Sequence, residues 1–239
     1  MTFLLVLLVT TALVFALKRP IKRWPLLFYG IAVALVALFI ADSYVEIPRV
    51  IHQGLFVLVH KCTLATALFA IVMYLGVLPR SSKARGWLMP IRGELSVIAW
   101  ILSLGHVVMY LMTYITMVAR GLTNANTFIV QSLVVALVVF VLLMALGVTS
   151  FASVKRRMKA RTWKRLQKLA YPFFVLVYVH LLLILLRPAL LGGQAAQVSV
   201  IVYSVLFLGY IALRAYRAVQ DRKEAQVVPA VAESAASLS

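Results

Sequence analysis

The stretch RTWKRLQKLAYPFFVLVYVHLLLILLRP, from Arg161 to Pro188, decides the fold class. It opens with a basic, amphipathic segment and continues as an almost unbroken apolar run that contains one histidine, His180. A helical run of about 20 apolar residues matches the ~30 Å hydrocarbon core of a bilayer. We therefore predict a transmembrane helix that carries an imidazole near its middle.

The whole chain has the composition of a membrane protein. Hydrophobic residues make up 64% of the 239 residues and charged residues only 13%, which excludes an ordinary soluble domain. The net charge of +18 does not indicate nucleic-acid binding, because the basic residues lie in short clusters between apolar runs. The single cysteine, Cys62, excludes an intrachain disulfide and a metal site built on several thiolates.

Apolar runs predict seven membrane spans. They lie at about 2–17, 25–42, 53–77, 94–118, 127–149, 170–187 and 197–218. In the first span the basic cluster KRPIKR follows the apolar run, whereas a signal peptide carries its positive charge in front. We interpret this span as retained, with an unusual cleaved signal as the alternative.

The basic residues also predict the orientation. The clusters at 18–23, 80–92, 155–168 and 214–223 hold 20 of the 24 Lys and Arg residues. Positive charge stays on the cytoplasmic side, so the N-terminus is expected outside and the C-terminus in the cytoplasm. We predict an all-α integral membrane bundle, with a low-complexity, disordered tail at 219–239.

Two of the four histidines fall at similar predicted depths. His106 lies 14 residues after Arg92, and His180 lies 12 residues after Lys168. At ~1.5 Å per residue these spacings give depths of roughly 21 and 18 Å from the cytoplasmic flank. Ionisable groups inside a bilayer are costly and usually functional. The alternative for a single histidine is a neutral side chain that is hydrogen-bonded to a neighbouring helix.

Histidines at one level on two helices suit the two axial positions of a haem iron. The sequence SLGHVVMY places Ser103 and Gly105 beside His106, and we expect these small residues to leave room for a macrocycle. Apolar and aromatic residues at helical spacing around His180 fit the same hypothesis, although such a stripe also occurs in ordinary helix packing.

Several motifs resemble the ferric-reductase-like transmembrane haem proteins. PIRGELSVIAWILSLGHVVMYL is similar to the first ligand helix of that family, and MALGVTS, a basic loop and WKRLQKLAYPFFVLVYVH resemble its later signature. The most similar branch is the bacterial membrane subunit that supplies electrons to periplasmic methionine sulfoxide reductase. The resemblance covers residues 25–218, so residues 1–24 are an added span and linker on a six-helix core.

The resemblance implies b-type haem held between histidines, with His106 and His180 at the outer-haem positions. Gln167 stands where the family has a further histidine, 13 residues before His180. Glutamine is a poor iron ligand compared with imidazole. We therefore expect one haem b instead of two.

His60 lies in the third predicted span beside Lys61, and its depth is ambiguous. It could bond a haem propionate, take part in a quinone site, cap a loop or simply bond a neighbouring helix. His52, at the outer end of the same span, is expected to be solvated.

The sequence favours an electron-transfer cytochrome b in a bacterial cytoplasmic membrane. A quinol or a bound flavin would donate electrons, and an extracytoplasmic redox protein or another acceptor outside would receive them. Any enzymatic role would be that of a haem-binding oxidoreductase subunit. The alternatives are a proton or ion transporter that uses the histidines and Glu94, and an assembly factor without a cofactor.

Overall fold

The computed structural model describes residues 2–45, 47–121 and 127–236, with side chains up to residue 222. Within these residues the chain is helical and has no strand. The elements are α1 (Thr2–Ala16), α2 (Lys18–Arg23), α3 (Pro25–Ala41), α4 (Arg49–Leu55), the π-helix η1 (Phe56–His60), α5 (Thr63–Val77), α6 (Lys83–Leu88), the 3-10 helix η2 (Met89–Ile91), α7 (Arg92–Ala119), α8 (Thr127–Ser150), α9 (Ala152–Arg157), α10 (Ala160–Gln167), α11 (Ala170–Leu190) and α12 (Gln194–Ala236). The all-α prediction is confirmed.

Four helical segments are long and apolar enough to cross a membrane. They are Lys83–Ala119, Thr127–Ser150, Ala160–Leu190 and Gln194–Arg222. A fifth is added if Arg49–His60 and Thr63–Val77, which meet at a 43° bend, form one span. The protein is therefore a multi-pass membrane protein.

The two N-terminal helices are shorter than a typical span. Thr2–Ala16 has 15 residues and Pro25–Ala41 has 17. At ~1.5 Å per residue they measure about 22 and 26 Å, a little less than the ~30 Å hydrocarbon core. Both match predicted apolar runs, but the count of seven spans stays a prediction.

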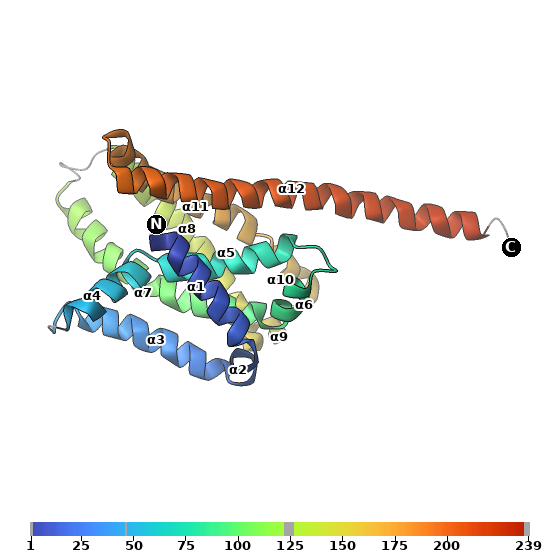
Figure 1. The fold of residues 1–239 in the computed structure, drawn as a ribbon, viewed down its shortest axis with the longest axis horizontal. Helices are drawn as coiled ribbons and strands as arrows, with labels where there is room; N and C mark the ends of the chain where they lie inside the picture. Colours follow the sequence, from blue (N-terminus) through green and yellow to red (C-terminus); the bar gives the residue numbers. More distant parts are fainter. Residues whose placement is uncertain (1, 46, 122–126, 237–239) are drawn as a thin grey trace.

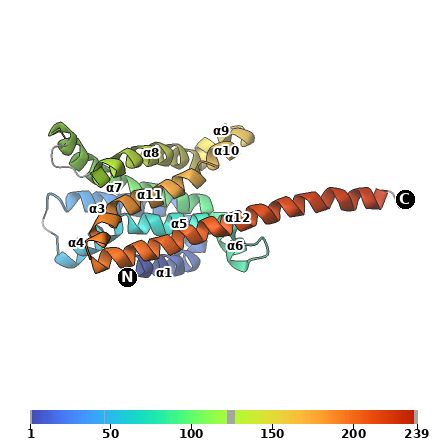
Figure 2. The ribbon, with the colours of Figure 1, turned by 90° about the horizontal axis from the view of Figure 1, so that it is seen from above.

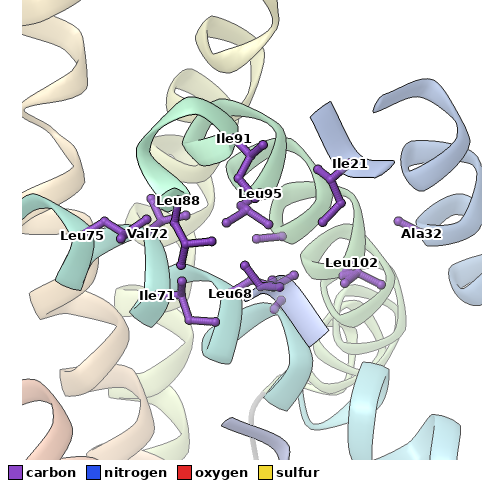
Figure 3. Close-up of a cluster of buried hydrophobic side chains, with 13 residues drawn as sticks. Ile21, Ala32, Leu68, Ile71, Val72, Leu75, Leu88, Ile91, Leu95 and Leu102 are labelled. Atoms are coloured by element: carbon purple, nitrogen blue, oxygen red, sulfur yellow. The ribbon is translucent and has the colours of Figure 1, made fainter. Parts of the chain in front are cut away.

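The core cluster with the most buried residues surrounds the first half of α7. Figure 3 shows Leu68, Ile71 and Leu75 of α5 facing Leu95 and Leu102 of α7, with other aliphatic side chains around them. These residues repeat at three- and four-residue intervals, so each helix presents one stripe to the other. The packing fixes α7, the helix that carries His106, against α5 and α3.

The N-terminal helix is packed into this bundle. In α1, the ring of Phe3 lies 4.4 Å from that of Tyr203 in α12, measured between centroids. The carbonyl of Phe15 accepts a hydrogen bond from Trp87 Nε1 at 3.2 Å. Helix α1 is therefore in contact with the helices that follow it.

The basic short helices gather at one end of the molecule. Figures 1 and 2 show α6, α9 and α10 at the end opposite α4, and Figure 1 places α2 with them. Three of the four basic clusters belong to this end, and the fourth lies along α12. This gathering agrees with the charge pattern, while the orientation of the termini stays a prediction.

Large apolar side chains cover much of the surface. Leu26 is 78% exposed, Val141 66% and Val205 70%, each on a different helix. Such a surface would be unfavourable in water and suits contact with lipid tails.

The last helix projects beyond the bundle. Figures 1 and 2 show α12 extending far past its neighbours, and its backbone is helical to Ala236. Our prediction of a disordered tail at 219–239 thus coincides with a described helix as far as Ala236, and residues 237–239 lie outside the described residues. Disorder of this tail in solution stays a prediction.

Candidate functional site: two histidines and a neighbouring cavity

The imidazole of His106 is held by a backbone carbonyl. Its Nδ1 lies 2.5 Å from the carbonyl oxygen of His60. A carbonyl can only accept, so Nδ1 carries the proton and donates it to this bond. The neutral ring then has an unprotonated Nε2, the form in which histidine binds a metal.

An interruption between two helices leaves that carbonyl accessible. The π-helix η1 ends at His60, Cys62 has a left-handed backbone with φ of 55°, and α5 begins at Thr63. In a continuous α-helix the His60 carbonyl would accept from the N–H of residue 64. The interruption leaves this oxygen for His106. A π-turn of this kind is often found at functional sites.

The imidazole of His180 is held in a similar way by α8. Its Nδ1 lies 3.0 Å from Ser132 Oγ and 3.3 Å from the Ser132 carbonyl oxygen. A proton on Nδ1 satisfies both oxygens, because a hydroxyl accepts as well as donates. Ser132 is 1% exposed, so little water competes with this interaction. Nε2 of His180 is again left free for a ligand bond.

The two histidines belong to the same part of the bundle. His106 lies on α7 and His180 on α11. Helix α8 packs on both α7 and α11, and α7 and α11 are not among the extensively packed pairs in the described part of the chain. A flat group between two histidines needs this separation of the helices.

The small residues beside His106 have a different role from the one we predicted. A Cβ on Gly105 would lie 3.0 Å from Val59 and 3.1 Å from Val36. Ser103 is buried and donates to the carbonyl of Ala99 at 2.8 Å. Gly105 therefore allows α7 to approach α3 and η1, and the expectation that it leaves room for a macrocycle was wrong.

His60 also contributes an imidazole to an aromatic cluster. Its ring stacks on Phe56 at 4.7 Å and lies 5.0 Å from Tyr110, which is 4.6 Å from the ring of His106. The Nδ1 of His60 is buried and has no hydrogen-bond partner among the described residues. His60 thus supports His106 through its main chain, while its side chain packs beside Tyr110. His52 is placed as expected, exposed and 2.6 Å from the Asp42 carboxylate.

Gln167 belongs to a second constellation, nearer the basic end. Its Nε2 donates to Thr149 Oγ1 at 3.2 Å, and Trp163 Nε1 donates to the Thr149 carbonyl at 3.0 Å. Thr149 thereby ties α10 to the end of α8. This contact gives a structural reason for the spacing between the threonine-serine pair, the tryptophan and Gln167.

Gln167 and Trp163 line a cavity of about 330 Å³. Its walls come from α5, α7, α8, α10 and α11, with Met89 from η2 and Lys155 from α9, and include Trp100 and Phe173. Neither His106 nor His180 lines it. The cavity and the histidine pair are therefore two separate sites along the same helices.

Sequence reasoning missed two residues of these sites, Ser132 and Trp100. Ser132 is a polar residue within an apolar run, and this position could have indicated a hydrogen bond to another helix. Trp100 gave no such signal, because a tryptophan in an apolar helix is ordinary.

Among the described residues, no three side chains of His, Cys, Asp or Glu converge as they would around a bare metal ion. Two imidazoles with free Nε2 atoms are the donor set that haem iron uses.

Part of the chain matches a known protein family. Residues 61–178 match the ferric reductase like transmembrane component. This match supports the family suggested by the motifs around His106 and Trp163. It ends two residues before His180, and it contains His106 and Gln167. A membrane redox role is the one that this family suggests.

A bacterial relative extends the similarity over almost the whole chain. An uncharacterized protein of Treponema pallidum (strain Nichols) is 36% identical over 232 residues, which cover 94% of this chain. The matched region is 63% of the relative's length, so the chain spans less than two thirds of that protein. No solved structure matches.

Proposed function

We propose that the protein belongs to the ferric-reductase-like transmembrane family and transfers electrons across a bacterial cytoplasmic membrane. His106 and His180 would hold one b-type haem through their Nε2 atoms. When bound, the haem supplies reversible one-electron chemistry. The chain itself fixes the two imidazoles, keeps them in the neutral form and shields them with apolar side chains.

One observation carries this proposal. Each imidazole has Nδ1 beside a backbone carbonyl, that of His60 for His106 and that of Ser132 for His180. A hydrogen bond at the second ring nitrogen is the usual way in which proteins orient a metal-binding histidine and raise its basicity. Two histidines are held in the same way on two helices that both pack on α8, and this arrangement favours a shared ligand over two unrelated polar residues.

Direction and partners follow from the charge pattern and the family resemblance. We place the N-terminus outside, seven spans in the membrane and the basic end in the cytoplasm. Electrons would come from a membrane quinol or a flavin, and an acceptor or redox protein outside would receive them. A role as the membrane subunit of a periplasmic methionine sulfoxide reductase is the most specific form of this proposal.

The absorption spectrum of the purified full-length chain tests the proposal. A haem bound by two histidines gives an intense Soret band and an α band that sharpens when dithionite is added. A proton or ion transporter, or an assembly factor, shows neither band. A chain that stays colourless after expression with added haem precursor would refute the proposal.

A further inference from the structure

The short helix α10, at the basic end of the bundle, carries a row of positive charges along one side (Figures 1 and 2). Residues three and four positions apart share one face of an α-helix. Four exposed cations follow one another at this spacing, namely Arg161, Lys164, Arg165 and the C-cap residue Lys168. These four residues are called the α10 stripe below. The electron-transfer site contains none of them.

The opposite face of α10 is attached to the bundle. Trp163 Nε1 donates to the Thr149 carbonyl at 3.0 Å, and Gln167 Nε2 donates to Thr149 Oγ1 at 3.2 Å. Both hydrogen bonds join α10 to the end of α8. Lys155 Nζ lies over the ring of Trp163, 4.4 Å from its centroid, and adds a contact from α9. The α10 stripe is therefore exposed on a helix that its neighbours hold in one orientation.

The α10 stripe has no negative charge nearby in the sequence to balance it. Residues 95–220 contain no aspartate and no glutamate. Within the described residues, no member of the stripe forms an ion pair with a carboxylate. Like charges three or four residues apart destabilise a helix. An anion from outside the chain would therefore stabilise α10 as well as bind to it.

The length of the adjoining helix places the stripe at the level of lipid headgroups. Helix α11 has 21 residues, and at ~1.5 Å per residue it measures about 31 Å, the thickness of the hydrocarbon core. Helix α10 precedes α11 in one candidate span, Ala160–Leu190. When α11 fills the hydrocarbon core, α10 lies just outside it, where the phosphates of the lipids are.

The surface next to the stripe is apolar. Val148 ends the exposed side of α8, and Tyr171 and Val175 are exposed at the start of α11. Helix α10 packs on α8 and leads directly into α11. A lipid has an anionic head for the stripe and acyl chains for this apolar surface. An acidic soluble protein would match the charged part alone.

We propose that the α10 stripe binds the phosphate groups of anionic phospholipids, with phosphatidylglycerol as the simplest example. Arginine guanidinium groups can hold a phosphate through two parallel hydrogen bonds, and lysines add point charges. Phosphatidylcholine carries a positive charge beside its phosphate, which the stripe repels. This binding requires neither haem nor the two histidines, so it is independent of the proposed function.

Native mass spectrometry of the purified full-length chain in a neutral detergent measures this binding. The chain is titrated separately with phosphatidylglycerol, phosphatidylcholine and inorganic phosphate. We expect saturable adducts of phosphatidylglycerol, formed at a concentration at least about fivefold lower than adducts of phosphatidylcholine. Inorganic phosphate should bind more weakly still, because it has no acyl chains for the apolar surface. Binding of inorganic phosphate as tight as that of the lipid would overturn the assignment to a lipid.

Paired variants test whether the stripe itself is the site. Lys164→Gln/Arg165→Gln should weaken phosphatidylglycerol binding about 20-fold, because each basic residue near an anionic surface contributes roughly fivefold. Arg217→Gln/Arg222→Gln removes the same charge from α12 and is the matched control, since Arg217 already lies 3.5 Å from the Asp221 carboxylate. This control should retain binding. The charge-preserving pair Lys164→Arg/Arg165→Lys should retain it as well.

Thermal unfolding in detergent separates lost binding from lost folding. Without lipid, Lys164→Gln/Arg165→Gln should melt no lower than the parent, because it removes repulsion along α10. Phosphatidylglycerol should raise the melting temperature of the parent and have little effect on this variant. Salt at roughly 1 M should abolish the increase, because the Debye length then falls to about 3 Å.

Three results would overturn the inference. The first is a parent chain that does not bind phosphatidylglycerol, and the second is equal weakening in Lys164→Gln/Arg165→Gln and in the α12 control. The third is tighter binding of a polyglutamate peptide than of phosphatidylglycerol, which would assign the stripe to an acidic protein partner. The absorption spectrum tests the proposed function separately, so failure of either proposal leaves the other in place.

Discussion

At the scale of single residues, the bond from each candidate ligand to a main-chain oxygen governs what substitutions should do. Nδ1 of His106 contacts the carbonyl oxygen of His60, and Nδ1 of His180 contacts both oxygens of Ser132. Truncating the side chain of His60 or Ser132 keeps the main-chain carbonyl that contacts the histidine. Truncating His106 or His180 removes the imidazole itself. Ligand and supporting residues should therefore be separable by mutation.

We predict close to one haem b per chain. His106→Ala and His180→Ala should each abolish haem binding, because each change removes one of the two proposed axial imidazoles. Gln167→Ala should leave haem content unchanged, because glutamine binds iron poorly. A pyridine haemochrome assay against protein concentration measures this. Two haems per chain, or loss of haem in Gln167→Ala, would contradict the prediction.

His60→Ala should largely retain haem, because the bond to His106 uses the His60 carbonyl and not its ring. Ser132→Ala should also retain haem but shift the midpoint potential, since the hydroxyl lies 3.0 Å from the imidazole of His180. Losses of such supporting groups typically cost ~10–100-fold in affinity or activity. Redox titration followed by the α band reports both variants. Complete loss of haem in His60→Ala would identify His60 as a ligand.

At the scale of helices, two local features hold the site. The first is the interruption between η1 and α5, where Cys62 adopts a positive φ. The second is the close contact between α7 and α8, where Trp100 lies on Gly147. Each feature depends on the side chain at one position, so each can be tested by a matched pair of variants.

Cys62→Ile should destabilise the fold relative to Cys62→Ala. A left-handed backbone costs an ordinary residue roughly 1–2 kcal/mol, and more for a β-branched one. We expect a lower melting temperature in detergent and weaker retention of haem, since the same turn presents the His60 carbonyl. Equal melting of the two variants would show that the turn carries no such strain.

Gly147→Ala should destabilise the protein by about 1–3 kcal/mol, as overpacking generally does. The added methyl group would overlap the indole of Trp100. Gly30→Ala in α3 is the control, because its Cβ would meet no atom within 4 Å. Thermal unfolding in detergent compares the two, and a stable Gly147→Ala chain would mean that α7 and α8 are more loosely packed than described.

At the scale of the whole molecule, charge and length govern insertion. Twenty of the 24 basic residues belong to the four clusters, and the short basic helices gather at one end. We predict that a reporter fused after residue 220 is active only if it functions in the cytoplasm. Activity of an export-dependent reporter at that position would reverse the orientation.

The sequence by itself determined the membrane class, the helical segments and the candidate histidines. These depend on local quantities, namely apolar run length, charge clusters and spacing along one helix. The departure at Gln167 was equally visible in the sequence. Haem binding by His106 and His180 stays a prediction.

Only the tertiary structure decided which atoms meet. Three features depend on residues that are far apart along the chain. They are the His60 carbonyl at the end of the π-helix η1, the Ser132 oxygens beside His180, and the indole N–H of Trp100, which has no partner among the described residues. The role of Gly105 was misread for the same reason, because a small residue can make room for a ligand or for another helix. Which of the two occurs depends on how the helices pack, and periodicity does not encode the packing partner.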